Sequence, residues 1–192
     1  KGKLPFITDD GVNIADSAFI RRHLETKYST DFDGGLTDSE KAISHAMARM
    51  LEERFYWTTV YSRWIDEHNW PIINRFWFGS MPPVIRSLVP IFAQRQVKNN
   101  LKAHGIGRHD AKDIYAFGAA DLAALSVHLA EKPFMFGDEP TSLDATAYPM
   151  IANAMVDELP GPLLVAAKSH SNFAPYIERC QALWFPDFSG EA

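Results

Sequence analysis

The apolar and polar positions at the start of the chain predict a β-hairpin followed by a helix. Two short apolar runs flank Asp9-Asp10-Gly11, and an Asp-Gly step between such runs is typical of a tight turn because glycine adopts positive φ without steric cost. Pro5 suits the edge or the first residue of a strand, since proline cannot donate to a sheet ladder. Asp16-Ser17 then opens a helical pattern whose apolar side reaches Leu24. The stretch therefore reads as strand, turn, strand and helix.

A polar segment then predicts a domain boundary. Residues 29–36 contain Asp-Phe-Asp-Gly-Gly, a composition typical of an inter-domain linker. Thr37 and Glu40 follow with the spacing of a capping box, in which each side chain accepts a backbone N–H of the other residue. We therefore expect one domain over residues 1–30 and a second over 37–192.

In the second domain the apolar positions recur at three- and four-residue steps, which predicts helices alone. Helices are expected at 38–66, 83–104, 111–130, 143–155 and 163–167, with a last one from Ser171 or Asn172. Residues 68–81 are expected to form a connection, because Pro71 and Gly79 interrupt the pattern. The fold class that follows is α+β overall and mostly α.

One apolar stripe is assigned to the core by its period. In the helix that starts at Pro82 or Pro83, the residues expected to point inward are Ile85, Leu88, Val89, Phe92, Val97 and Leu101. Pro90 lies inside this helix, and Gly105 ends it. The turn Gly105-Ile-Gly-Arg-His109 has glycines like a phosphate loop, but it follows no strand and lacks the Gly-Lys-Ser/Thr ending. It is interpreted as an interhelical turn.

Composition and charge narrow the functional classes. The chain has 192 residues, 46% hydrophobic, with a formal net charge of −5, so a nucleic-acid surface is not indicated. No apolar stretch approaches the roughly 18 residues of a membrane span. The single cysteine, Cys180, excludes an internal disulfide; it falls on an apolar helix face and is interpreted as a buried structural thiol. No two histidines have the i, i+4 spacing of a helical metal site, so no metal site is expected. The expected location is cytoplasmic.

The start of the first helix offers chemistry for a small ligand. Asp16 and Ser17 place a carboxylate, a hydroxyl and the free N–H groups of a helix terminus together, which suits the polar end of a small molecule. If the Leu4–Pro5 bond is cis, the backbone of Leu4 is available to an extended ligand; the sequence does not show the isomer. The simpler alternative is that Pro5 only begins a strand and Asp16 or Ser17 only caps a helix.

A second candidate set is aromatic. The helix expected over 38–66 carries more aromatic residues than one apolar stripe needs, which indicates a helix buried on several sides. Most of them are interpreted as core. The alternative is a hydrophobic substrate pocket formed by Tyr56, Trp57, Tyr61 and Trp64.

Two motifs carry a family resemblance that covers nearly the whole chain. Leu4-Pro-Phe-Ile, a turn and Ile14-Ala-Asp-Ser resemble the second half of the thioredoxin-like domain of glutathione transferases. Phe134-Met-Phe-Gly-Asp138 followed by Thr141-x-x-Asp144 resembles the element that opens the central helix of their all-helical domain. A narrower resemblance, to the metaxin and failed-axon-connections branch, rests on Lys1-Gly-Lys-Leu-Pro-Phe, Arg63-Trp-Ile-Asp66, Gly105-Ile-Gly-Arg-His109 and Lys132-Pro-Phe-Met-Phe-Gly-Asp138.

This resemblance implies a glutathione site. Leu4 and Pro5 would pair with the cysteinyl backbone of glutathione, while Asp16 and Ser17 would hold its γ-glutamyl end. It also implies that a βαβ-type unit lies upstream of Lys1, so the catalytic residue, an activating Tyr, Ser or Cys, is unknown and expected in that segment. Homodimerisation is a family expectation that no residue establishes.

Two functions remain open. The first is a glutathione transferase that conjugates or reduces small apolar electrophiles, with glutathione as co-substrate and no metal. The alternative is a non-catalytic module of the same fold, used for protein interaction or organelle-surface assembly. The support for this alternative is the branch resemblance, since many members of the branch are not established transferases, and the aromatic segment 70–78 if it is exposed. The glutathione transferase is the main prediction.

Overall fold

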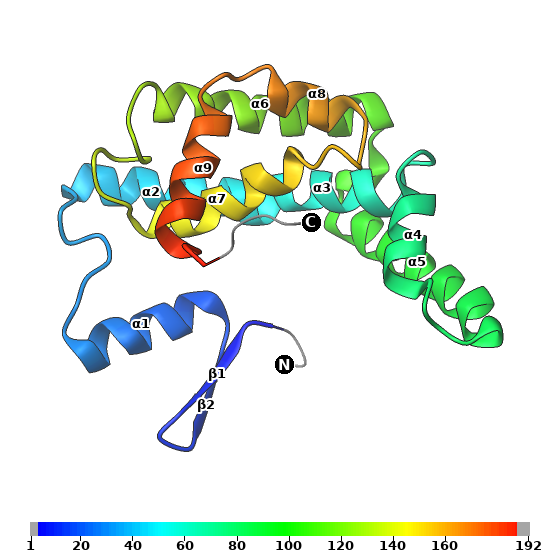
Figure 1. Cartoon of the computed structure of the whole chain (residues 1–192), viewed down its shortest axis with the longest axis horizontal. Helices are drawn as coiled ribbons and strands as arrows, with labels where there is room; N and C mark the ends of the chain where they lie inside the picture. Colours follow the sequence, from blue (N-terminus) through cyan, green and yellow to red (C-terminus); the bar gives the residue numbers. More distant parts are fainter. Residues whose placement is uncertain (1–3, 188–192) are drawn as a thin grey trace. The chain divides into compact units, whose positions relative to one another are not determined.

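The structure is a computed structural model that describes residues 4–187 and divides into two compact units, Lys1–Lys41 and Ala42–Ala192 (Figure 1). In the described residues, one pair of strands comes first and helices follow. The mostly helical α+β class is thereby confirmed. The expected domain boundaries at residues 30 and 37 stay predictions, and the chain ends of those domains, 1–3 and 188–192, lie outside the described residues.

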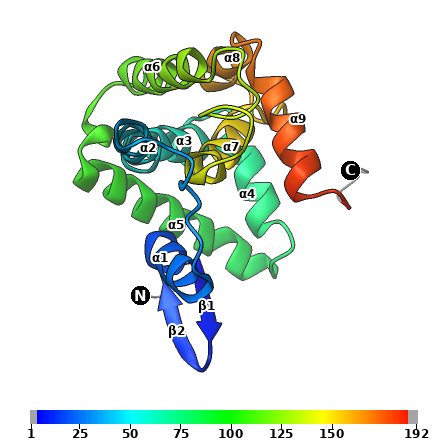
Figure 2. The ribbon, with the colours of Figure 1, turned by 90° about the vertical axis from the view of Figure 1, so that its left-hand side faces the viewer.

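The first unit begins with the predicted hairpin. Strand β1 (Phe6–Asp9) pairs antiparallel with β2 (Val12–Ala15), in a register that sets Phe6 opposite Ala15. Asp10 and Gly11 form the turn with φ values of 47° and 79°, the left-handed backbone that an Asp-Gly turn requires. Helix α1 (Ser17–Tyr28) follows and packs beside the hairpin (Figures 1 and 2).

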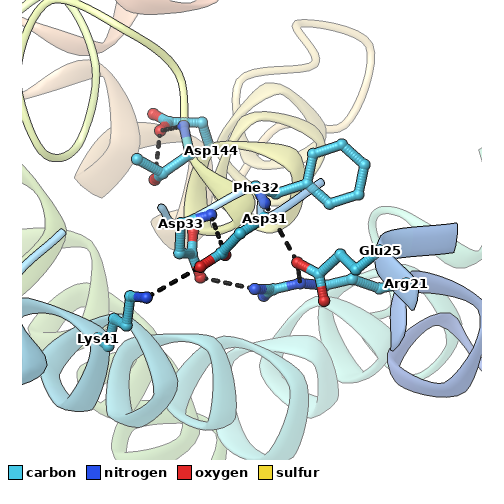
Figure 3. A network of polar contacts seen from close by, with 8 residues as sticks. Arg21, Glu25, Asp31, Phe32, Asp33, Lys41 and Asp144 are labelled. Carbon is cyan, nitrogen blue, oxygen red and sulfur yellow. Dashed lines mark hydrogen bonds and ion pairs between the residues drawn. The ribbon is translucent and has the colours of Figure 1, made fainter. Parts of the chain in front are cut away.

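Charged side chains fold the segment that follows α1 (Figure 3). Arg21 donates to Glu25 and, through Nη2, to Asp33 Oδ2, both at 2.8 Å. The Asp33 N–H donates to Asp31 Oδ1 at 2.8 Å, and Lys41 Nζ donates to Asp31 Oδ2 at 3.0 Å. Asp33 is buried, so its charge needs the Arg21 partner. The polar residues of this segment therefore form specific hydrogen bonds and ion pairs.

The predicted long helix forms in three consecutive pieces. These are α2 (Asp38–Met50), the π-helical turn η1 (Leu51–Phe55) and α3 (Tyr56–Trp64). The capping box at its start is confirmed, because the Thr37 N–H donates to Glu40 Oε2 at 2.8 Å and the Glu40 N–H donates to Thr37 Oγ1 at 3.3 Å. The helix ends at Trp64, two residues before the expected end.

The connection expected over 68–81 is wrong in its central part, which is a helix. Helix α4 (Trp70–Phe78) begins after Asn69, whose carbonyl accepts the N–H groups of Ile72 at 3.0 Å and Ile73 at 3.1 Å. Pro71 stands in its first turn, where a missing N–H costs nothing. Pro71 therefore begins a helix here and does not interrupt one.

Helix α5 (Pro83–His104) has the expected bounds, and Gly105, with φ 108°, caps its C-terminal end. Its expected inward face is largely wrong: Leu101 is buried and Val97 half-buried, but the other expected residues are exposed, namely Ile85, Leu88, Val89 and Phe92. The period of apolar positions shows which residues share a face. Whether another element covers that face is decided by the tertiary structure.

The remaining helices build the core of the second unit. The 3-10 turn η2 (Ile106–Arg108) leads into α6 (Ala111–Leu129), then α7 (Ser142–Ala154), α8 (Pro162–Lys168) and α9 (Phe173–Trp184). Figures 1 and 2 show α6 and α8 side by side. The largest core side chains include Leu51, Phe55, Leu122, Leu125, Ile151, Phe173 and Tyr176.

Candidate functional site

The first candidate site lies where β1 and α1 begin. The Asp16 N–H donates to the Pro5 carbonyl at 3.1 Å, so the start of the strand and the start of the helix are adjacent. Leu4 precedes Pro5 through a cis peptide bond, and Ser17 is the first residue of α1. The structure therefore brings Leu4, Pro5, Asp16 and Ser17 together in the first unit, and all four are exposed.

The chemistry of this group suits a small ligand that carries both an ammonium and a carboxylate group, as the predicted γ-glutamyl end of glutathione does. Asp16 caps α1, since its Oδ1 accepts the Ala18 N–H at 3.1 Å, and it holds φ 85°, a strained value for a residue with a Cβ. A carboxylate attracts an ammonium group, while a hydroxyl and the positive end of a helix dipole attract a carboxylate. The γ-glutamyl end carries both charges. Leu4, which is 84% exposed, is accessible to the rest of an extended ligand.

The four aromatic candidates contact different helices. Tyr56 is exposed and meets Trp57 edge-on, with ring centroids 5.4 Å apart. Trp57 stacks on His104 of α5 at 4.9 Å, whereas Tyr61 meets Tyr115 of α6 at 5.8 Å. Trp57 and Tyr61 pack against buried clusters, in line with the interpretation that most of these aromatics belong to the core.

Trp64 lies in a different environment from the other three. Its ring centroid is 5.6 Å from that of Trp70 and 6.4 Å from that of Phe78, so it anchors α4 against the end of α3. The aromatic candidates thus contact α4, α5 and α6 separately.

An open cavity of about 540 Å³ lies elsewhere in the second unit. It is lined by Arg54, His104, Gly105, Ile106, Arg108, His109 and Phe117. None of the four aromatic candidates lines it. Arg54 is engaged in an ion pair, because its Nε donates to both carboxylate oxygens of the buried Asp121 at 3.1 and 3.0 Å. The Gly105–His109 turn is a wall of this cavity and an interhelical connection, as its sequence indicated.

The buried phenol of Tyr115 and the half-buried carboxylate of Asp66 form a pair that no local sequence pattern indicates. The Tyr115 hydroxyl donates to Asp66 Oδ2 at 2.6 Å. Burial and the neighbouring carboxylate raise the pKa of Tyr115. Burial opposes ionisation of Asp66, but hydrogen bonds from Tyr115 and from the His68 N–H outweigh it and lower the pKa of Asp66. The phenol therefore stays protonated at neutral pH as a donor. The two residues are 49 positions apart, so no local pattern signals the pair.

The environment of Cys180 is that of a structural thiol. Cys180 is fully buried, and burial raises the pKa of its thiol to about 11, so it is a poor nucleophile at neutral pH. Across residues 4–187, no group of three or more His, Cys, Asp or Glu side chains is arranged to hold a metal ion. In the same part of the chain, no helix combines the length and apolar content needed to cross a bilayer. The catalytic residue expected upstream of Lys1 lies outside the described residues.

Comparison with known families gives two matches. Residues 1–69 match the glutathione S-transferase N-terminal domain, and residues 118–180 match the glutathione S-transferase C-terminal domain. No solved structure matches the chain significantly.

Curated relatives match over nearly the whole chain. Failed axon connections of Drosophila melanogaster is 35% identical over 98% of this chain and 48% of its own length. Isoprene-epoxide–glutathione S-transferase of Rhodococcus sp. (strain AD45) is 30% identical over 93% of this chain and 76% of its length. Metaxin-1 of Mus musculus is 31% identical over 96% of this chain and 61% of its length.

The similarity covers a different fraction of each relative's length. The chain spans about half the length of Failed axon connections and more of the other two. The hairpin with α1 and the all-helical unit correspond to the two parts of the fold that the sequence motifs indicated. The chain therefore belongs to the glutathione S-transferase family and resembles its failed-axon-connections and metaxin branch.

Proposed function

We propose that this chain is a non-catalytic module of the glutathione S-transferase fold that mediates protein interaction or assembly at the surface of an organelle. The observation that carries the proposal is an exposed apolar region on two consecutive helices, which we name the α4–α5 apolar surface. It consists of Ile72, Phe76, Trp77, Val84, Ile85, Leu88, Val89, Ile91 and Phe92. Nine exposed apolar side chains between positions 72 and 92 are more than the scattered single ones usual on a protein surface, and such a concentration is typical of an interaction site.

The similarity to the branch supports this proposal. Failed axon connections and metaxin-1 match over nearly the whole chain, and the branch resemblance implies that catalysis is not a general property of its members. Fold alone does not determine function, so the exposed surface carries the argument.

The second candidate is a glutathione transferase, favoured by the isoprene-epoxide–glutathione S-transferase relative. In this function Asp16 and Ser17 bind the γ-glutamyl end of glutathione, Leu4 and Pro5 lie along its backbone, and the second substrate is a small apolar electrophile. Tyr56 is the aromatic candidate with an exposed ring to offer it. A homodimer and a cytoplasmic location belong to this proposal too.

Calorimetry with glutathione on the full-length protein separates the two functions. A non-catalytic module gives no heat of binding from a folded sample. A transferase binds in the micromolar to millimolar range, about −8 to −4 kcal/mol, and loses that binding in Asp16→Ala and in Ser17→Ala. Asp113→Ala, which removes an exposed carboxylate from the first turn of α6, is the matched control. Binding that Asp113→Ala retains and Asp16→Ala loses overturns the non-catalytic proposal.

A further inference from the structure

The α4–α5 apolar surface exposes side chains that water solvates poorly. Phe76 is 76% exposed, Val84 71%, Phe92 67% and Trp77 59%. Phe76 and Trp77 form an edge-on pair with centroids 5.2 Å apart in the last turn of α4, and Val84 lies in the first turn of α5. The most exposed residues thus flank the corner between the two helices, which lies at one end of the helical unit in Figure 1.

The charged residues within the segment that carries this surface all have one sign. Between Glu67 and Asp110 the sequence has six Lys or Arg residues and no Asp or Glu, although the whole chain has a net charge of −5. Arg75 and Arg86 are exposed beside the apolar residues. Arg86 Nη1 makes a long hydrogen bond of 3.5 Å to the Gly79 carbonyl, and a carbonyl does not neutralise the charge of a guanidinium. The region therefore combines apolar side chains with net positive charge.

We propose that the α4–α5 apolar surface docks on the surface of an anionic lipid bilayer. This inference rests on the proposed function and names the partner of the same surface. An interfacial helix inserts apolar and aromatic side chains into the headgroup boundary while its Lys and Arg residues contact anionic headgroups. Aromatic rings such as Trp77 favour that boundary, and the stem of an arginine covers apolar surface while its guanidinium stays in the polar layer.

A second copy of this chain fits the surface less well than a bilayer does. A two-fold interface pairs the same surface with itself, so Arg75 and Arg86 would meet the same positive charges in the partner. Like charges facing each other across an interface are unfavourable. An anionic bilayer supplies both an apolar phase and negative charge, which matches both properties of the surface.

Vesicle flotation with the full-length protein tests the proposal. The probes are phosphatidylcholine vesicles and vesicles in which roughly one lipid in three is phosphatidylserine. We expect flotation with the second kind that weakens when NaCl is raised from about 0.1 M to about 1 M, because the Debye length falls from about 10 Å to about 3 Å.

Substitutions locate the contact. Arg86→Glu is expected to weaken partitioning about fivefold or more, because each basic side chain near an anionic surface contributes at that level. Trp77→Ser is expected to weaken it about tenfold, since it removes a large apolar group from the boundary. The controls are Lys112→Glu, an exposed charge on α6, and Val127→Ser, an apolar side chain that is 80% exposed on α6.

Each outcome has a defined meaning. Binding that is lost in Arg86→Glu and Trp77→Ser, and kept in both controls, supports the proposal. A folded protein that does not float with anionic vesicles overturns it, and so does equal loss in the controls or a dimer in sedimentation that Trp77→Ser dissociates. Failure here leaves the glutathione calorimetry unchanged, so the non-catalytic function and the lipid partner are tested separately.

Discussion

At the scale of single residues, Asp144 joins three segments of the helical unit through its carboxylate. It is fully buried, and its Oδ2 accepts the Thr141 N–H at 2.8 Å, which together with the Thr141 side chain completes a capping box at the start of α7. Its Oδ1 accepts the Met135 N–H at 2.9 Å and the Tyr176 hydroxyl at 3.0 Å. Asp144, labelled in Figure 3, therefore joins a helix start to the preceding loop and to α9, beyond the capping role that its sequence spacing indicates.

Replacing Asp144 with alanine is expected to lower the free energy of unfolding by about 3 kcal/mol or more. The change leaves buried donors without an acceptor, and each such donor costs about 1–3 kcal/mol. Chemical denaturation monitored by circular dichroism measures the effect. The control is Asp157→Ala, because Asp157 is exposed and its ion pair with Lys168 contributes about 0–1 kcal/mol. Equal losses in the two variants would contradict this role for Asp144.

Asp9 gives a pH-dependent prediction at the same scale. Hydrogen bonds with His23 and Lys27, each at 2.6 Å, lower the pKa of Asp9. A lowered folded-state pKa stabilises the fold above the unfolded value of about 3.9, and this stabilisation is lost as pH falls through the folded pKa. We expect Asp9→Asn to melt below the parent at neutral pH and to match it in acid. A difference in melting temperature that does not change with pH would argue against the ion pairs.

At the scale of elements, Gly118 sets how closely three helices pack. It is buried on α6, and a Cβ at this position would lie 2.6 Å from Thr58 Cγ2 of α3 and 3.2 Å from Leu163 Cδ1 of α8. The first distance is shorter than real Cβ contacts, so the Thr58 side chain or one of the helices would have to shift. Glycine disfavours a helix interior by about 1 kcal/mol relative to alanine, and here the close approach explains its presence.

Gly118→Ala is therefore expected to destabilise the protein by about 1–3 kcal/mol, the usual cost of overpacking, despite the better helix propensity of alanine. Thr58→Ser removes the methyl group that clashes while it keeps the hydroxyl that donates to the Ile114 carbonyl. The double variant should recover most of the loss in a denaturation experiment. Additive losses in the double-mutant cycle would show that the Thr58 contact is not the cause.

At the scale of the whole molecule, the buried core ends at α4. Ile73 and Phe78 are buried, whereas Phe76 and Trp77 on the same helix are exposed. One side of α4 therefore belongs to the core of the second unit, and the other begins the α4–α5 apolar surface. Apolar residues on the exposed side contribute little to stability, so their presence is better explained by an interaction.

A matched pair on α4 tests where the core ends. Phe78→Ala is expected to cost about 3–5 kcal/mol, because it removes a buried aromatic ring. Phe76→Ala is expected to change the free energy of unfolding by no more than about 0.5 kcal/mol, as exposed substitutions usually do. Denaturant titration of both variants compares them directly. A large loss in Phe76→Ala would place that ring in the core and remove it from the docking surface.

The sequence by itself determined the features that depend on nearby residues. The Asp10-Gly11 turn, the Thr37 cap and the helix end at Gly105 follow from the sequence, because turns, caps and helix ends are set within about four residues. The sequence also indicates that Asp16 and Ser17 lie at the start of α1, since the N-cap position has strong residue preferences. The family motifs are also local, so the sequence alone indicates the family.

Only the tertiary structure decided what depends on distant residues. The Arg54–Asp121 ion pair joins positions 67 apart and the Tyr115–Asp66 bond joins positions 49 apart, and neither has a local signature. The exposed first half of α5 was assigned to the core, because apolar periodicity specifies a face but not the element that covers it. Within the described part of the second unit, no element buries the α4–α5 apolar surface, and such burial depends on how distant elements pack.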